Sequence, residues 1–244
     1  MSTKTTTKIN GSEAPRGENI NWFHGGTVIT QTKTADSTDA TNGYITLTET
    51  AEFGSVVATL NGVSTIVDEN NDASTATNAT DTNRAVFPGG ITSGDEIVLI
   101  YVDSVTSPLV HVTSSMDVDI GSNMDVQKET VHGQANKAKF VGAMDTTATL
   151  ERLVYNLDFI GACIGSKTTD SSGNVKVTTA FQGSVKLESL VGEERDSAGV
   201  LIRKWVLYGC QTTNVNLNCA RDNFYKEQFN FEIDKYTLFQ PGNS

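Results

Sequence analysis

Phe229-Asn-Phe-Glu-Ile-Asp-Lys-Tyr-Thr-Leu-Phe239, near the C-terminal end of the sequence, decides the fold. Phe229, Phe231 and Ile233 alternate with polar residues, which is the two-residue period of a β-strand with one buried face and one solvated face. We therefore expect this strand to close an antiparallel sheet or to pair with a neighbouring molecule. Further strands are expected upstream, over residues 175–190, 200–208 and 210–218.

The composition of the 244-residue chain favours many short strands. Hydrophobic residues make up 37% and charged residues 19%, and Thr, Ser, Asn and Gly fill the difference. Thr favours strands, whereas the other three favour turns. The predicted fold class is all-β: a β-barrel or sandwich with one flanking α-helix, plus a small β-sandwich module. A chain of this length can bury a core without disulfides.

The charge balance limits the classes of partner. The chain has 18 basic and 29 acidic residues, a net charge of −11. This argues against a protein that grips nucleic acid through a basic patch, because that grip depends on Lys and Arg displacing counterions. No apolar run approaches the ~20 residues of a membrane span, and the first eight residues do not resemble a secretory signal. We expect assembly in a cytoplasm.

The three cysteines, Cys163, Cys210 and Cys219, have no CxxC spacing. This odd count fits buried reduced thiols better than a disulfide framework or a zinc site. A bridge between Cys210 and Cys219 across a turn is the alternative.

The chain divides into three expected parts. Residues 1–42 form a polar N-terminal arm, a first strand around Trp22 and a Thr-rich linker over 31–42. Residues 43–107 form a β-sandwich module of their own, with a hairpin turn at Asn61-Gly62. Residues 108–244 form the core. Apolar residues at helical spacing from Leu150 to Ile164 predict one amphipathic helix near 151–164.

No constellation of residues points to catalysis or to a bound cofactor. His24, His111 and His132 are scattered without a metal-binding spacing. Four oxygen-bearing residues around Gly121 resemble a calcium loop but lack its closing Glu, so a calcium site is only an alternative here: Asp117, Asp119, Asn123 and Asp125. We expect no enzyme activity, no cofactor and no metal.

Three segments of the second half together resemble a known family. They are Tyr155-Asn-Leu-Asp-Phe-Ile-Gly-Ala-Cys-Ile-Gly165, Trp205-Val-Leu-Tyr-Gly-Cys210 and Gln228-Phe-Asn-Phe-Glu-Ile-Asp-Lys-Tyr236. Residues 108–244 resemble the major tail tube proteins of tailed bacterial and archaeal viruses. The resemblance implies a β-barrel with a flanking helix that forms hexameric rings, which stack into a hollow tube for viral DNA. Residues 43–107 would then be an inserted small immunoglobulin-like β-sandwich on the outside of the tube, similar to modules that some tail proteins carry.

This resemblance implies partners and surfaces. The partners would be further copies of the chain, other tail proteins (tape measure, terminator, baseplate or tip) and DNA passing without sequence-specific binding, in a virion assembled in the host cytoplasm. A net negative charge would suit a bore that repels phosphate. The expected interface residues are Trp22, Phe23, Phe229, Phe231, Ile233 and Tyr236. The candidates for bore-lining carboxylates, with ordinary outer-face charges as the alternative, are Glu188, Glu232 and Asp234.

Two other classes of function remain open at this stage. One is a different virion or surface structural protein, such as a capsid decoration subunit, a fibre or an adhesin whose 43–107 module binds sugar. The other is a hydrolase on a β-sandwich, which only scattered carboxylates favour.

Overall fold

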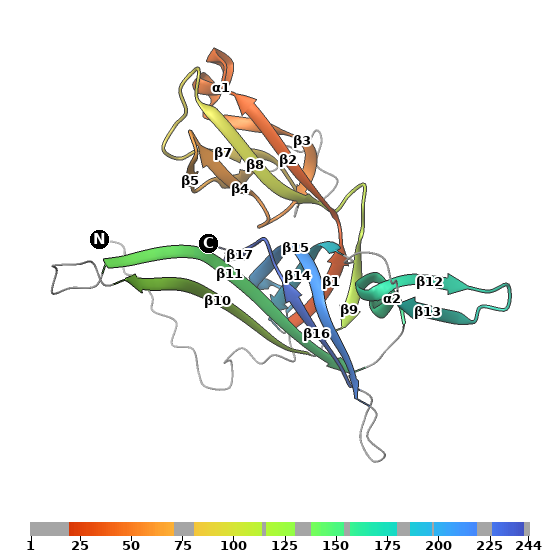
Figure 1. Ribbon diagram of the computed structural model, residues 1–244. Helices are drawn as coiled ribbons and strands as arrows, with labels where there is room; N and C mark the ends of the chain where they lie inside the picture. The colour runs from red at the N-terminus through yellow and green to blue at the C-terminus, as the bar shows by residue number, and fades with distance from the viewer. Residues whose placement is uncertain are drawn as a thin grey trace.

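The computed structural model describes residues 20–70, 81–113, 116–129, 138–153, 157–179, 186–196, 198–218 and 226–241. It confirms the all-β fold class, because strands dominate and both helices are short. Figure 1 shows two curled bodies: a large sheet below and a smaller β body above it. We call them the main sheet and the module, and the module is the chain between the strands β1 and β9, residues 26–108.

The main sheet has the strand order β10-β11-β16-β15-β14-β1-β9, and β17 also pairs with β15. All its strand pairs are antiparallel. Within the described residues the order does not close into a ring, so the expected barrel is a curled, open sheet. Its strands are β1 (Ile20–Gly25), β9 (Leu109–Thr113), β10 (Met116–Glu129), β11 (Ala138–Leu153), β14 (Lys186–Arg195), β15 (Leu201–Asn218), β16 (Lys226–Glu232) and β17 (Lys235–Phe239).

The segment 229–239, expected as one strand, belongs to two strands, β16 and β17. In β16, Phe229 and Phe231 are buried, while Glu232 is exposed, as the alternation predicts. At Asp234 the chain leaves the line of β16, and β17 continues along β15 as far as Lys204. Gly209 of β15 lies opposite this break with a φ of +61°, and a Cβ there would meet Asp234 Oδ2 at 2.0 Å. A glycine is therefore required where the strand changes direction.

The core of the main sheet contains Trp22, Leu207, Phe229 and Phe231, together with Phe159 of the helix α2 (Asp158–Ile164). A small hairpin, β12 (Gly165–Thr169) with β13 (Val175–Thr179), follows this helix and packs beside it (Figure 1).

The expected helix over 151–164 is thus only partly present. Residues 151–153 continue β11, where Leu150 and Arg152 are buried and Glu151 is not. The apolar residues of this segment fit both the two-residue period of a strand and the spacing of three or four residues in a helix. Residues 151–153 follow the strand period, so the prediction of a helix there was wrong.

The module is a second sheet with its own core. Its strand β8 lies between β2 and β4, and β3 meets β8 only at Ala51. Buried residues of β3, β7 and β8 form one apolar cluster, which includes Ile45, Ala85, Ile97 and Leu99. Its elements are β2 (Thr27–Thr34), α1 (Ser37–Asn42), β3 (Tyr44–Glu52), β4 (Val57–Leu60), β5 (Val63–Thr65), β6 (Asp68–Asn70), β7 (Asp81–Val86) and β8 (Glu96–Asp103).

The module begins earlier than expected. The segment predicted as a linker, 31–42, contains the second half of β2 and the helix α1 instead. β2 pairs along its whole length with β8, from Thr27 opposite Asp103 to Thr34 opposite Glu96. The Asp36 side chain accepts hydrogen bonds from the first turn of α1 as its N-cap. A Thr-rich segment alone does not show whether it is a strand or a linker, because the partner strand, β8, lies about 70 residues away.

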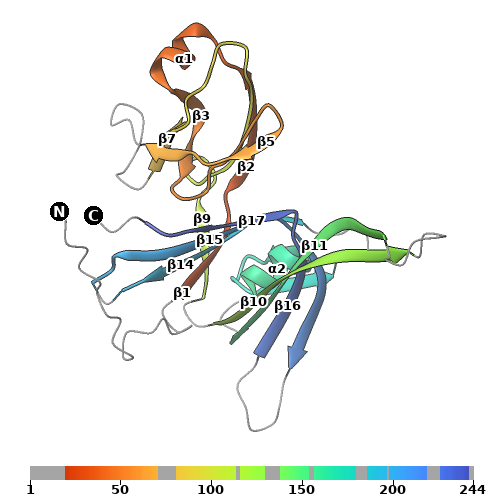
Figure 2. The same ribbon diagram turned by 90° about the vertical axis from the view of Figure 1, so that its left-hand side faces the viewer.

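The module is inserted into a hairpin of the main sheet. Gly25, the last residue of β1, is opposite Leu109, the first residue of β9. The 83 residues between them are therefore, in topology, the loop of a β1–β9 hairpin. In Figure 2 both connections run side by side between the two bodies.

Candidate functional site

Three strands of the main sheet pair on one side only within the described residues: β9, β10 and β17. An unpaired strand edge exposes backbone donors and acceptors that can accept a strand of another molecule. β17 also carries exposed apolar side chains, since Leu238 is 61% exposed and Tyr236 is 41% exposed. The β17 edge therefore combines an unpaired backbone with exposed apolar side chains, which suits contact with another molecule.

The β10–β11 hairpin is a second candidate for contact between molecules. Residues 147–153 of β11 pair with β16, whereas 138–146 pair with β10 alone. In Figure 1 this end of the hairpin reaches far beyond the rest of the sheet. It is long enough to lie against a neighbouring copy.

Four of the six expected interface residues are inside the subunit. Trp22, Phe229, Phe231 and Ile233 are at most 6% exposed, and β16 is paired on both sides. The expectation that they contact another subunit is therefore not supported. A strict alternation cannot distinguish a strand that packs inside its own chain from one that packs against a neighbour.

The other two expected interface residues have different surroundings. Phe23 is half-buried and packs edge-on against His111, with 5.4 Å between the ring centroids. It also contacts the apolar cluster between the main sheet and the module. Tyr236, on β17, is the one member of the expected set that presents a large exposed surface.

The junction between module and main sheet is built around the segment 52–56, which we call the docking loop. Tyr208 of β15 donates a hydrogen bond to the Ser55 carbonyl. The Phe53 ring packs edge-on against Phe239, with 4.9 Å between the centroids. Glu52 forms an ion pair with Lys204. Behind these polar contacts lies an apolar cluster, Val102, Val191, Val206 and Tyr208.

Lys204 is 2% exposed and is held between carboxylates of the two bodies. Besides Glu52 it pairs with Glu193 of β14, with 2.9 Å from Nζ to Oε1. Arg195 also pairs with Glu193, at 2.8 Å. Burial pushes the pKa of the Glu193 carboxyl upward, but these two cations outweigh it, and the pKa lies below its usual value.

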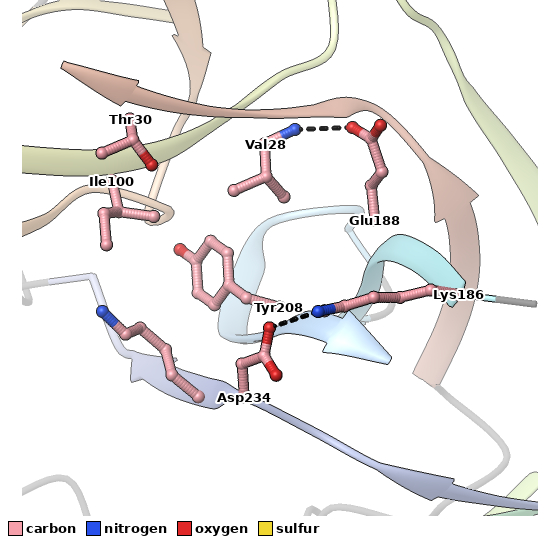
Figure 3. A pocket seen from close by; sticks show the side chains of 9 residues that line it. Val28, Thr30, Ile100, Lys186, Glu188, Tyr208 and Asp234 are labelled. Atoms are coloured by element: carbon pink, nitrogen blue, oxygen red, sulfur yellow. Dashed lines mark hydrogen bonds and ion pairs between the residues drawn. The ribbon is translucent and has the colours of Figure 1, made fainter. Parts of the chain in front are cut away.

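A cavity of about 420 Å³ opens at the same junction, between β2 and β8 of the module and β14, β15 and β17 of the main sheet. Figure 3 shows Tyr208 at its centre and two of the expected bore-lining acids on its wall. Glu188 accepts a hydrogen bond from the Val28 N–H at 2.9 Å. Asp234 pairs with Lys186 at 2.6 Å. Both acids are exposed and line this cavity, and Glu188 contacts the module through Val28.

The third expected acid, Glu232, lies apart from this cavity. It is exposed on β16, opposite Thr147 of β11 and Gln211 of β15. Its neighbour Phe231 points into the core, so Glu232 points away from it. The structure therefore does not bring the three carboxylates together.

The net charge is also distributed unevenly. Residues 26–108 contain 11 acidic and 2 basic residues, a net charge of −9, which leaves −2 for the remainder of the chain. The acidity that was expected to suit a bore thus belongs mainly to the module. Sequence inspection could have found this by counting charges separately for each part.

A fully enclosed ion pair joins β11 and β16 beneath the core. Arg152 Nε and Glu227 Oε2 are 2.7 Å apart, and both side chains are 0% exposed. Arg152 also donates to the Val112 carbonyl at 3.1 Å and lies over the Phe159 ring. Burial raises the pKa of the Glu227 carboxyl, and Arg152 opposes that rise. This pair was missed because nothing in the sequence distinguishes it from surface charges.

In the described part of the chain, no group of three His, Cys, Asp or Glu side chains could hold a metal. His24 packs against Phe159, and burial and the nearby Arg152 lower its pKa. His132 lies outside the described residues. Asp117–Asp125, the alternative calcium loop, runs as extended strand within β10, whereas such a loop must curl around the ion.

Cys163 and Cys210 are buried free thiols. Burial raises the pKa of Cys163 to about 12, so this thiol stays protonated and unreactive at neutral pH. Cys219 lies outside the described residues. None of the described helices is long and apolar enough to cross a membrane.

Comparison with known proteins finds no matching family model and no matching curated protein. Several solved structures are partly similar, and three of them each cover 54% of this chain. They are the anti-feeding prophage baseplate (8% identity, 84% of that chain, TM-score 0.39), the PVC sheath-tube complex of an extracellular contractile injection system in the extended state (13%, 83%, 0.34), and the anti-feeding prophage tube-terminating cap (15%, 83%, 0.34).

Proposed function

We propose that the protein is a structural virion protein that polymerises, as stacked hexameric rings, into a hollow tail tube through which viral DNA enters the host cell. The observation that carries the proposal is that, among the described strands, the main sheet is open and its edge strand β17 exposes Tyr236 and Leu238. A sheet with unpaired edges and exposed apolar residues is incomplete alone, and identical copies around a closed ring can cover such edges. The number six and the stacking rest on the resemblance of residues 108–244 to tail tube proteins.

Within this proposal the module lies outside the tube. Glu188 and Asp234 line the cavity at the junction with the module, so they would not line the bore, and Glu232 is the remaining candidate of the three. Because the remainder of the chain is nearly neutral, repulsion of DNA would come from how charges are placed around the bore rather than from the net charge. The tape measure, terminator and baseplate or tip proteins would be its partners in the tail.

The proposal is tested by comparing two equally exposed apolar positions. Leu238 on β17 is 61% exposed and Val63 on the module is 68% exposed. Leu238→Asp should leave the subunit folded but prevent rings and tubes, because it places a charge in an interface. Val63→Asp should assemble like the wild type. Sedimentation velocity measures assembly, and circular dichroism measures folding.

Negative-stain microscopy of the unmodified protein distinguishes the other structural roles. Hollow rings or tubes support a tail tube. Trimers or elongated particles would favour a fibre, and compact particles that bind capsids without self-association would favour a decoration subunit. Equal assembly of Leu238→Asp and the wild type would show that β17 is not the contact surface.

A further inference from the structure

Glu69 of β6 is the residue that holds the docking loop in shape. Its carboxylate accepts a hydrogen bond from the Gly54 N–H at 2.6 Å and from the Val56 N–H at 2.9 Å. Thr82 of β7 adds a third donor at 3.3 Å. One side chain therefore fixes the backbone on both sides of Ser55, whose carbonyl receives the hydrogen bond from Tyr208 of the main sheet.

The contacts between the two bodies depend on this same loop. Glu52, Phe53 and Ser55 reach Lys204, Phe239 and Tyr208, respectively. Loss of the bonds to Glu69 would release Gly54 and Val56, and with them the conformation that presents these side chains and the Ser55 carbonyl. Glu69 does not itself touch the main sheet through any bond described above, so it acts as a positioning residue.

We propose that Glu69, by fixing the docking loop, makes the docking of the module on the main sheet depend on pH. The proposal does not depend on tube assembly, because every contact in it lies within one chain. It uses one half-buried carboxyl, the three donors that bond to it and the docking loop that these bonds fix.

The charged and titratable groups around Glu69 support a transition near neutral pH. Burial raises the pKa of Glu69 to about 7, against the pull of the two backbone N–H groups, Thr82 and Lys204. From β15, Lys204 faces it as a cation and Tyr208 as a phenol whose pKa burial raises. From β3, Glu52 shares Lys204 with it. When Glu69 takes up a proton, the Thr82 hydroxyl can turn and accept the new O–H.

The sign follows from linkage. The pKa of Glu69 is higher in the folded loop than its ordinary value of 4.5, so the folded loop binds the proton more tightly than the open loop. The stability that this gives is fully present below pH 4.5 and is lost as the pH rises through about 7. Docking should therefore be tighter in mild acid than in mild alkali.

Hydrogen–deuterium exchange of the full-length protein at pH 5 and pH 8, corrected for intrinsic exchange rates, tests this proposal. Protection of residues 53–56 should fall by roughly one to two orders of magnitude from pH 5 to pH 8, and β17 should exchange faster in parallel because Phe239 packs on Phe53. Glu69→Gln should abolish this pH dependence. Asp68→Asn, a neighbouring exposed carboxyl on the same strand, should preserve it.

A flat pH profile in the wild type, an unchanged slope in Glu69→Gln or a lost slope in Asp68→Asn would overturn the proposal. If Glu69→Gln does not fold, Tyr208→Phe carries the test. It removes the bond to Ser55 but leaves the bonds to Glu69, so it should lower protection of residues 53–56 at both pH values with the slope retained. Wild-type protection in Tyr208→Phe would show that the loop does not depend on docking.

Discussion

The Arg152–Glu227 ion pair lies fully inside the core. Both side chains are removed from water, so each charge relies on the other. Arg152→Met should lower the free energy of unfolding by about 3–5 kcal/mol, because it leaves the Glu227 carboxylate buried without its cation. Urea denaturation measures this loss.

The neighbouring pair Lys226–Glu151 is the matched control. It joins the same two strands, but its side chains are 56% and 35% exposed. Lys226→Met should therefore cost less than about 1 kcal/mol. Similar losses in the two variants would mean that the Arg152–Glu227 pair is open to water.

Gly209 gives a second prediction at this scale. Gly209→Ala needs both a left-handed backbone and room for a Cβ that Asp234 occupies. Gly199 also has positive φ, +82°, but no atom lies within 4 Å of its Cβ position. Gly209→Ala should cost roughly 1–3 kcal/mol more than Gly199→Ala, measured by thermal unfolding of both variants. Equal costs would contradict the crowded turn at Asp234.

Among the secondary-structure elements, the β1–β9 hairpin makes the module removable in principle. Replacing residues 26–108 with Asn-Gly would join Gly25 to Leu109 by a two-residue turn, which such hairpins prefer. That excision exposes the apolar partners Val191 and Val206. We expect the excised chain to aggregate, and the same chain with Val191→Thr and Val206→Thr to be soluble with β-type circular dichroism. An excised chain that unfolds even with both threonines would mean that the main sheet needs the module.

The elements also show what local sequence can predict. The alternation at Phe229 and Phe231 predicted a strand correctly, because a two-residue period needs no knowledge of the partner. The second half of β2 was missed because only its pairing with β8 distinguishes a Thr-rich strand from a linker. The start of α2 was misplaced because Leu150 and Arg152 are buried by a strand partner, β16, that lies about 80 residues away.

The prediction of the candidate contact surfaces had the same limit, because burial depends on partners that are distant in the sequence. The sequence predicted which side chains are apolar in 229–239, but not that Phe229 and Phe231 are covered within the chain while Tyr236 and Leu238 are not. That difference depends on where β16 gives way to β17, which Gly209 and Asp234 determine across a strand pair. The buried Arg152–Glu227 pair and the docking loop likewise depend on contacts between distant segments.

The whole molecule consists of two bodies with different surfaces. The module carries most of the net charge and contacts the main sheet through the docking loop, whereas the main sheet has strand edges that are unpaired among the described residues and that we propose other copies cover. The acidic module would then cover the outside of an assembly, where like charges keep neighbouring particles apart.

A density map of the assembled protein tests the central claim most directly, because it can place a neighbouring chain against β17. We predict a hollow ring in which a strand of the next copy lies about 4.8 Å from β17 and covers Tyr236 and Leu238. An assembly in which the β17 edge faces solvent, or a chain that stays monomeric at every concentration, would contradict the account.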